Sequence, residues 1–599
     1  MILNQNRFVG TAVPLFSLRT RRSYGAGDIT DLKIFSDWIA ATGQKIIQLL
    51  PINDTTKDGT WRDSYPYNCI SVFALHPIYI DPDEIGRINN KILAEEFQKE
   101  RTSLNSLDKV DYERVMSLKL RMLRELFREY ANETFSLPEF LSFYDENSSW
   151  LPVYAAFCTL RDRFSSADFS KWGDLSSYNS QIVDNLHKAD NLGREEMDFY
   201  IFVQFHLHRQ FRRVKKYCSE RGIYLKGDLP IGISPHSAEA WSEPELFNTS
   251  MQAGAPPDAF SSDGQNWGFP TYNWDTIAGA DYSWWKRRLS VMSYYFDIYR
   301  IDHILGFFRI WEIPKPHKNG ALGHFNPSMP LTPDEIESYE FHFSYDQIDT
   351  EGISTDVLFI RDLRQKGRFH PRIEAQSTSC YMSLSQEQKE AYNRLYNDFF
   401  YKRHNDLWAE HALKILPHII SSSTMIPCGE DLGMIPESVP RVIEQLNIAS
   451  LEIQRMPKST GIRFADPAQY HYLSVCSTGT HDMSNLREWW EEDRAASELF
   501  FMDIIKEHGD FPAACEPWVC KKIIRQHIES PSVFAIFPLQ EWLSMSVKYR
   551  ITEPHSERIN IPANPEQYWQ YRMPVEIEKL IEDRLYNDEI LLMIQNSGR

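Results

Sequence analysis

The sequence lacks the marks of a secreted, membrane-spanning or disulfide-stabilised protein. Its eight cysteines, among 599 residues, form no CxxC pair, so we expect reduced thiols and neither a disulfide framework nor a structural zinc site. No apolar run approaches the length of a membrane span. Arg7, Gly10 and Pro14 interrupt the apolar residues of the amino-terminal segment, which therefore lacks a signal-peptide core. These absences predict a cytoplasmic location.

Positive charge is also scarce. The chain has 64 Lys and Arg residues against 83 Asp and Glu residues, a net charge of −19. Because phosphate groups would repel such a chain, we expect neither nucleic acid nor an anionic membrane as a partner. No repeat of 20–50 residues is visible, and a composition of 42% hydrophobic and 25% charged residues is typical of a soluble globular protein. The 13% of aromatic residues would suit a neutral sugar, whose C–H faces pack on flat rings.

Five short apolar runs each end on an acidic residue. A buried strand that finishes in a carboxylate is costly unless the charge is used. In a (β/α)8 barrel the carboxyl ends of the parallel strands converge on one face, where the active site lies. We therefore predict an α/β fold of the (β/α)8 TIM-barrel class. The five runs end at Asp228, Asp302, Glu430, Asp482 and Glu541.

The rest of the chain is consistent with one elaborated barrel, with inserted, mostly helical subdomains. A helix over Arg194–Arg221, capped by Gly222 and followed at once by a strand from Ile223, is the αβ half of a repeat unit. We expect a single catalytic domain over 1–599, a helical insertion over about 88–200, and a second insertion over about 315–400. Other expected elements are a strand in Lys45–Asn53, a helix near Gln386–Asn405, a strand at Val533–Leu539 and a closing helix at Pro574–Asn596.

Arg300 and Asp302 lie two residues apart on one predicted strand, so their side chains share a face. A guanidinium beside a carboxylate favours the ionised form, and a positioned carboxylate can attack an anomeric carbon. The alternative is an ordinary Arg–Asp ion pair at the end of a strand.

Glu430 and Asp482 complete a set of three acids. Glu430 could be a general acid if burial or neighbouring negative charge raises its pKa, or simply an acid at a helix start. His481 and Asp482 could bind adjacent sugar hydroxyls, or form a capped turn. A metal site at Asp302-His303 or His481-Asp482 is the less favoured interpretation, because adjacent strand residues point apart and no HExxH motif is present. We expect neither a metal nor a cofactor.

These motifs resemble those of the 4-α-glucanotransferases, the amylomaltase or disproportionating-enzyme family (glycoside hydrolase family 77) of the α-amylase superfamily. The resemblance spans nearly the whole chain. It is carried by VPLFSLRTRRSYGAGD and SYPYNCISVFALHP near the start, GDLPIGISPHSAEAW, GAPPDAFSSDGQNWGFPTYNW, RIDHILGFFRIWEIP, PCGEDLGMIPESV, GTHDMSNLREWW, and RINIPANPEQYWQYR near the end.

The resemblance implies a retaining transfer of α-1,4-glucan segments between maltooligosaccharides or glucans, through a covalent glucosyl-enzyme on Asp302. It implies that Glu430 acts as acid and then base, and that Asp482 stabilises the transition state. The substrate contacts that it implies are Arg300, His481, Asp228, Tyr67, Trp267, Gln265 and Asp258. The loop Ala259–Trp274 is the predicted lid that excludes water.

The chain also departs from its relatives. The stretch between Asp302 and Glu430 is longer than in compact bacterial amylomaltases and resembles the group that includes the cytosolic plant enzymes, whose members often carry starch-binding modules; such modules could occur in a longer gene product. Gly232 stands where many relatives have Tyr, so an aromatic contact near Asp228 is expected to be missing. Three rival functions stay open: a hydrolase of the same superfamily, a non-catalytic glucan-binding protein, and a metal-dependent hydrolase.

Overall fold

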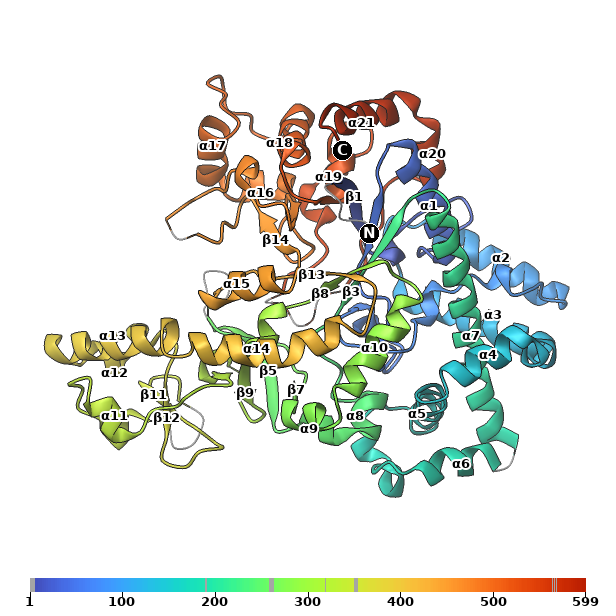
Figure 1. The fold of residues 1–599 in the computed structure, drawn as a ribbon. Helices are drawn as coiled ribbons and strands as arrows, with labels where there is room; N and C mark the ends of the chain where they lie inside the picture. The colour runs from blue at the N-terminus through green and yellow to red at the C-terminus, as the bar shows by residue number, and fades with distance from the viewer. Residues whose placement is uncertain are drawn as a thin grey trace.

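A closed barrel of eight parallel strands forms the centre of the molecule (Figure 1). The structure is a computed structural model that describes residues 6–599 except 189–190, 258–262, 318, 349–353, 460, 563, 565 and 567. The strands occur around the barrel in chain order, as expected for a (β/α)8 fold. They are β1 (Phe8–Val13), β2 (Ile46–Leu49), β3 (Tyr224–Leu229), β8 (Ile298–Ile301), β13 (Ile426–Gly429), β14 (Ser450–Ile453), β15 (Ser474–Ser477) and β16 (Phe534–Pro538).

The ladder between strands is continuous except at one place. Most neighbouring strands pair over several residues, as β3 does with β8 from Lys226 to Leu229. Between β13 and β14 there is a single parallel bridge, Cys428 to Ala449. This bridge closes the barrel, and the predicted fold class is confirmed.

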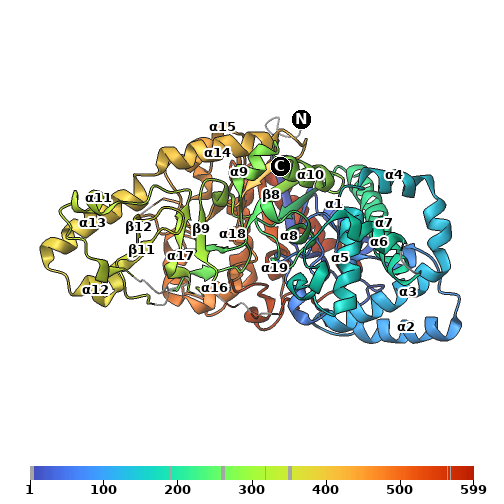
Figure 2. The ribbon, with the colours of Figure 1, turned by 90° about the horizontal axis from the view of Figure 1, so that it is seen from below.

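Helices surround the barrel and extend from it on two sides (Figures 1 and 2). Those before β13 are α1 (Ile29–Ala41), α2 (Lys91–Asn105), α3 (Tyr112–Ser136), α4 (Pro138–Glu146), α5 (Leu151–Phe164), α6 (Ser180–Lys188), α7 (Asn191–Ser219), α8 (Ala238–Ser242), α9 (Trp274–Gly279), α10 (Ser283–Ser293), α11 (Pro333–Glu337), α12 (Ser379–Met382), α13 (Gln386–Tyr401) and α14 (Asn405–Ile420). Those after it are α15 (Ser438–Gln445), α16 (Leu486–Glu492), α17 (Arg494–Asp503), α18 (Pro517–Glu529), α19 (Leu539–Ser544), α20 (Ile577–Glu582) and α21 (Arg584–Asn596). No helix in this described part of the chain is both long and apolar enough to cross a membrane.

The two regions inserted between barrel strands lie on opposite sides of the barrel (Figure 2). The region from α2 to α6 is helical, as its sequence indicates. The region between β8 and β13 is more mixed than expected, because short strands occur in it beside the helices. Its small strands are β9 (Ile310–Pro314), β10 (His324–Asn326), β11 (Phe359–Arg361) and β12 (Phe369–Pro371). Four more small strands lie between β3 and β8: β4 (Phe247–Asn248), β5 (Met251–Ala255), β6 (Gln265–Asn266) and β7 (Thr271–Tyr272), of which β4 and β7 pair together.

Several elements match the sequence-based expectations. Helix α7 coincides with the predicted helix over 194–221 to within three residues at each end. Gly222 follows it with a φ of 66°, a left-handed conformation that glycine adopts without strain. Glu541 was expected at the end of a strand, and this is wrong: β16 ends at Pro538 and Glu541 lies in the first turn of α19, because Pro538 ends the ladder.

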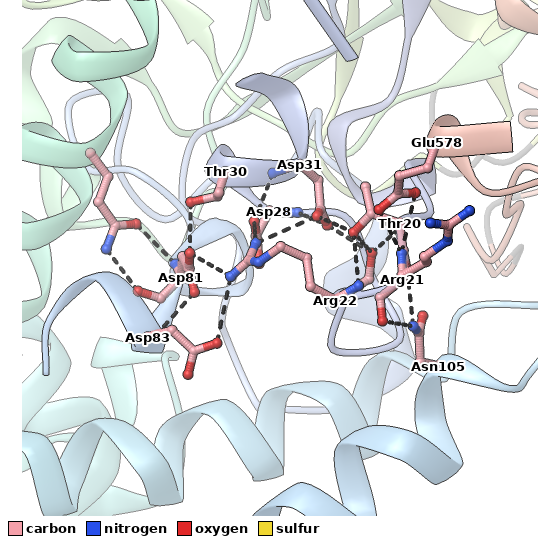
Figure 3. A network of polar contacts seen from close by, with 12 residues as sticks. Thr20, Arg21, Arg22, Asp28, Thr30, Asp31, Asp81, Asp83, Asn105 and Glu578 are labelled. Carbon is pink, nitrogen blue, oxygen red and sulfur yellow. Dashed lines mark hydrogen bonds and ion pairs between the residues drawn. The ribbon is translucent and has the colours of Figure 1, made fainter. Parts of the chain in front are cut away.

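A buried polar network ties the opening segment to the rest of the fold (Figure 3). Arg22 lies 2.6 Å from Asp81 and 3.3 Å from Asp28. Asp28 caps α1 by accepting the Asp31 amide proton, in a reciprocal capping box. Lys119, on α3, donates to the backbone oxygen of Ile80 at 2.8 Å. The opening segment, α1 and the α2–α3 region are therefore held together around Arg22.

Candidate active site

Three acidic side chains stand at the carboxyl ends of three neighbouring barrel strands. Asp228 is the last residue but one of β3, Asp302 follows β8 directly, and Glu430 follows β13 directly. Because β3, β8 and β13 are adjacent in the sheet, these carboxylates project at one edge of the barrel. Asp302 and Glu430, two of the three acids expected to form the catalytic set, therefore lie on adjacent strands together with Asp228.

Arg300 connects the three acids. Its Nη1 lies 2.7 Å from Asp228 Oδ1 and 2.8 Å from Asp302 Oδ1, and its Nη2 lies 3.9 Å from Glu430. Burial opposes the charge of the guanidinium, but the carboxylates of Asp228 and Asp302 outweigh it and hold the pKa of Arg300 well above its usual value. Because its buried guanidinium is paired in this way, Arg300 stays positively charged.

Glu430 is held by two backbone amides. The amide of His303 donates to Oε2 at 3.1 Å and that of Leu432 donates to Oε1 at 2.8 Å. His303 has a φ of 44°, a left-handed conformation that is strained for a residue with a side chain. Burial raises the pKa of Glu430 to about 7, although Arg300 opposes the shift. The strain at His303 coincides with the amide that orients Glu430.

Asp482 lies in the loop that follows β15, across the mouth of the barrel from β8. Its Oδ1 accepts a hydrogen bond of 2.6 Å from the side-chain amide of Asn560. The backbone amide of Asn560 donates to the carbonyl oxygen of His481 at 3.1 Å. The Asp482 side chain is 38% exposed, whereas that of His481 is 7% exposed. Asn560 therefore fixes both neighbouring residues while one face of Asp482 stays open.

Tyr67 joins the two sides of the barrel mouth. Its hydroxyl donates to Asp228 Oδ2 at 2.9 Å, and its ring stacks on His481 with centroids 5.3 Å apart and planes 9° apart. Trp569 packs against both rings. An unbroken series of contacts thus runs from Asp302 and Glu430, through Arg300, Asp228, Tyr67 and His481, to Asp482.

Trp267 and Gln265 lie beside this group. The Trp267 ring packs edge-on against His303, with centroids 4.9 Å apart, and its indole nitrogen donates to Gln265 at 3.0 Å. Gln265 belongs to β6, which pairs with β5. Asp258 and residues 259–262 of the predicted lid lie outside the described residues.

Position 232, where many relatives have Tyr, has no room for a side chain in this protein. A Cβ atom added to Gly232 would lie 2.2 Å from the ring of Phe269. Phe269 in turn stacks on Trp267, with centroids 5.7 Å apart. A ring from the β6–β7 segment therefore occupies the space that a side chain at position 232 would need.

A cavity that is partly open to solvent lies among the barrel strands and the loops that follow them. Its lining includes Gln48, Lys226 and Ile536 on barrel strands, Glu541 in α19, and Arg300 and His481. Asp302, Glu430 and Asp482 do not line it. The cavity therefore extends from the barrel interior to the loop after β15, beside Arg300 and His481.

Nothing in the sequence indicated that three residues position the acids or the rings beside them. These residues are His303, Asn560 and Trp569. The segment RINIPANPEQYWQYR, which contains the last two, signals only that the closing segment belongs to the family pattern. Neither Asp302-His303 nor His481-Asp482 forms part of a three-residue metal-ligating group; in the described chain such a group occurs elsewhere, at His324, Asp362 and His370.

The chain is similar to known proteins over nearly its whole length. A family model described as 4-alpha-glucanotransferase matches residues 13–577. The chain is 36% identical to 4-alpha-glucanotransferase DPE2 of Oryza sativa subsp. japonica, over 99% of this chain and 70% of that protein. It is 28% identical to a 4-alpha-glucanotransferase of Chlamydia muridarum, over 95% of this chain and 92% of that protein.

Solved structures share the fold. An amylomaltase from Streptococcus agalactiae, in complex with acarbose, superposes with a TM-score of 0.72 at 21% identity, covering 99% of each chain. An amylomaltase from Corynebacterium glutamicum gives 0.64 at 18% identity, over all of this chain and 76% of the other. The family match over nearly the whole length shows that this chain belongs to the 4-alpha-glucanotransferase family, glycoside hydrolase family 77, and is a glucan-transferring enzyme.

Proposed function

We propose that the chain transfers α-1,4-glucan segments with retention, through a covalent glucosyl-enzyme on Asp302. The observation that carries the proposal is the placement of Asp302 and Glu430 on either side of one guanidinium, that of Arg300. Two carboxyl groups flanking a glycosidic bond, one ionised and one protonated, are what retaining chemistry needs.

In this mechanism the Asp302 carboxylate attacks C1 of the donor sugar, and the bond from C1 to the leaving oxygen breaks. Glu430, whose pKa is raised to about 7, gives its proton to that oxygen. The resulting Glu430 carboxylate then removes the proton of an incoming sugar hydroxyl, which displaces Asp302 from C1. The two inversions leave an α-linkage.

The remaining residues are proposed to position the sugar. Asp482, held by Asn560 and 38% exposed, would accept hydrogen bonds from ring hydroxyls, which strengthen as positive charge develops at C1. His481, Asp228, Tyr67 and Arg300 would bind the same sugar unit. Trp267 and Gln265, with Asp258, would contribute to a closing segment that keeps water from the intermediate.

A maltotriose incubation tests this proposal. Transfer predicts glucose together with a ladder of longer maltooligosaccharides, at a constant number of reducing ends. All new linkages should be α when examined by proton NMR. Reducing ends that rise without longer products would instead support hydrolysis, and β-linked products would contradict retention.

Trapping the intermediate tests the role of Asp302 itself. With Glu430→Gln and an α-glucosyl fluoride donor, the intermediate forms without acid assistance but breaks down slowly, because the base is missing. Mass spectrometry of peptides should then find one glucosyl unit on Asp302. A label on another residue, or no label while fluoride is released in a burst, would remove Asp302 from the proposed role.

A further inference from the structure

A second cluster of ionisable side chains lies in the region between β8 and β13. His324 is on β10, Asp362 follows β11, and His370 is on β12. Their exposed fractions are 4%, 5% and 1%. One potential ligand atom from each of the three lies within 4.8 Å of the other two. The cluster therefore bridges the four-stranded sheet that contains β10 and the β11–β12 hairpin.

The two imidazoles each present an unpaired nitrogen. His324 Nδ1 lies 3.2 Å from the carbonyl oxygen of Phe325, which places the proton on Nδ1 and the lone pair on Nε2. His370 Nε2 lies 2.8 Å from Asp362 Oδ2. The remaining nitrogens, His324 Nε2 and His370 Nδ1, are fully buried and have no hydrogen-bond partner among the described residues. Buried polar atoms in native proteins normally have a partner.

The charge around the cluster suits a cation. Asp362 contributes one negative charge, and its Oδ1 also accepts the backbone proton of Arg364 at 2.8 Å. The guanidinium of Arg364 is paired with the buried carboxylate of Glu312, at 2.7 Å, and Thr271 donates to the other oxygen of Glu312. Because the Arg364 charge is compensated, the two histidines and Asp362 present a net charge of −1 when the imidazoles are neutral.

We propose that His324, His370 and Asp362 bind a first-row divalent transition metal ion of the Zn²⁺ type, which links β10 to the β11–β12 hairpin. Two imidazole nitrogens and one carboxylate form a donor set that Zn²⁺ and Co²⁺ favour, whereas Mg²⁺ and Ca²⁺ prefer oxygen ligands alone. The contact between His324 Nδ1 and a carbonyl oxygen is the kind of support that metal-bound histidines receive. The role is structural, since these residues are not among the active-site contacts described above.

Binding requires one local rearrangement. The imidazoles of His324 and His370 are stacked, with centroids 4.2 Å apart and planes 6° apart. A metal ion lies close to the plane of each ring that ligates it, and two parallel stacked planes have no common point. The His370 ring must therefore rotate and release its hydrogen bond to Asp362 Oδ2, which frees that oxygen to ligate the ion. The metal-bound protein should lose both this hydrogen bond and the stacking.

Metal titration of the full-length chain tests the proposal. After removal of bound metal with a chelator, the chain should bind one Zn²⁺ in competition with a chromophoric chelator, and one Co²⁺ with visible d–d bands of nitrogen and oxygen ligation. Mg²⁺ and Ca²⁺ should not compete. Zn²⁺ should also raise the unfolding temperature of the chain.

Matched variants locate the ion. His370→Gln should weaken Zn²⁺ binding at least about tenfold, whereas His342→Gln, an exposed histidine of the same region, should not change it. Circular dichroism of the metal-free variants controls for folding. If His370→Gln does not fold, His324→Gln is the test, because the His324 hydrogen bond goes to a backbone oxygen, whereas that of His370 goes to the buried carboxylate of Asp362. Absence of a stoichiometric site in the natural chain, equal binding by all variants, or a thiolate spectrum with Co²⁺ would overturn the proposal.

Discussion

Two buried clusters in this protein each consist of an arginine and three acidic residues. One holds chain segments together, and the other is the proposed active site. Around Arg22, the carboxylates of Asp28, Asp31 and Asp81 are at most 1% exposed. Around Arg300, Asp302 and Glu430 keep 18% and 13% of their side chains exposed. An arginine with three acids is therefore not in itself a mark of catalysis, and access to the acids is what separates the clusters.

The partners of the acids differ as well. Both oxygens of Asp31 accept from hydroxyl groups, those of Thr20 and Ser23, at 2.6 and 2.8 Å. In the Arg300 cluster, Oδ2 of Asp302 has only a long contact with the amide of Ile231, 3.3 Å, among the described residues. The oxygens of Asp31 thus hold chain segments together, whereas Oδ2 of Asp302 is available for reaction.

The sharpest test of this comparison is a pair of isosteric substitutions. Asp302→Asn should lower kcat for maltotriose disproportionation on the order of 10⁴-fold or more, because an amide cannot form the glucosyl ester. Asp28→Asn, in the Arg22 cluster, should leave kcat per folded molecule unchanged. Similar losses in both variants, at equal folded fractions, would erase the distinction between the clusters.

Substitution of the arginine in the Arg22 cluster should lower the stability of the protein. Arg22→Met leaves Asp28, Asp31 and Asp81 without their shared cation, and we expect a loss of about 3 kcal/mol in the free energy of unfolding. Urea denaturation measures it. Arg21→Met is the matched control, because Arg21 is exposed and its pair with Glu582 lies at the surface, so no measurable change is expected.

The pH dependence of the rate should follow the Arg300 cluster. Glu430 must be protonated to assist the leaving group, and its pKa is raised to about 7. The protonated fraction is complete well below pH 7 and falls above it, so kcat/KM should decline about tenfold per pH unit on the alkaline side. The profile of Glu430→Gln, measured with an activated donor, should lack this decline. An alkaline decline that persists in the variant assigns it to another group.

The smallest effect is expected from a residue that touches an acid without reacting. Asn560→Ala removes the 2.6 Å hydrogen bond to Asp482, and kcat should fall about tenfold, with a much smaller change in KM. Asn560→Asp places a negative charge against Asp482 and should be worse. Equal kcat values for Asn560→Ala and the natural chain would show that Asp482 needs no such support.

The barrel and its acids could be predicted from the sequence because both leave local signals. Apolar runs that end in Asp302 and Glu430 mark strand ends, and the basic end of α7 with Gly222 marks a helix end. Glu541 gave the same signal but lies in a helix, because a proline three residues earlier ends the strand. An apolar run that ends in an acidic residue is thus a strong indicator of a strand end, but a helix start can give the same pattern.

The remaining contacts depend on residues far apart in the chain. Asn560 reaches Asp482 across 78 residues, and Tyr67 reaches Asp228 across 161. The left-handed backbone at His303 has no sequence signal, since residues other than glycine seldom adopt it. The small strands between β8 and β13 have three to five residues each, too short for a clear alternation of polar and apolar positions.

The single bridge between β13 and β14 has a consequence for motion. Two backbone hydrogen bonds span this joint, from Gly429 to Ala449 at 2.8 Å and from Ala449 to Pro427 at 3.1 Å, and Glu430 is the next residue. Local breathing costs least where the ladder is thinnest. In hydrogen–deuterium exchange the amides of Gly429 and Ala449 should therefore lose protection before those of β3 and β8. Glu430 would then follow the strand whose pairing in the barrel opens most easily.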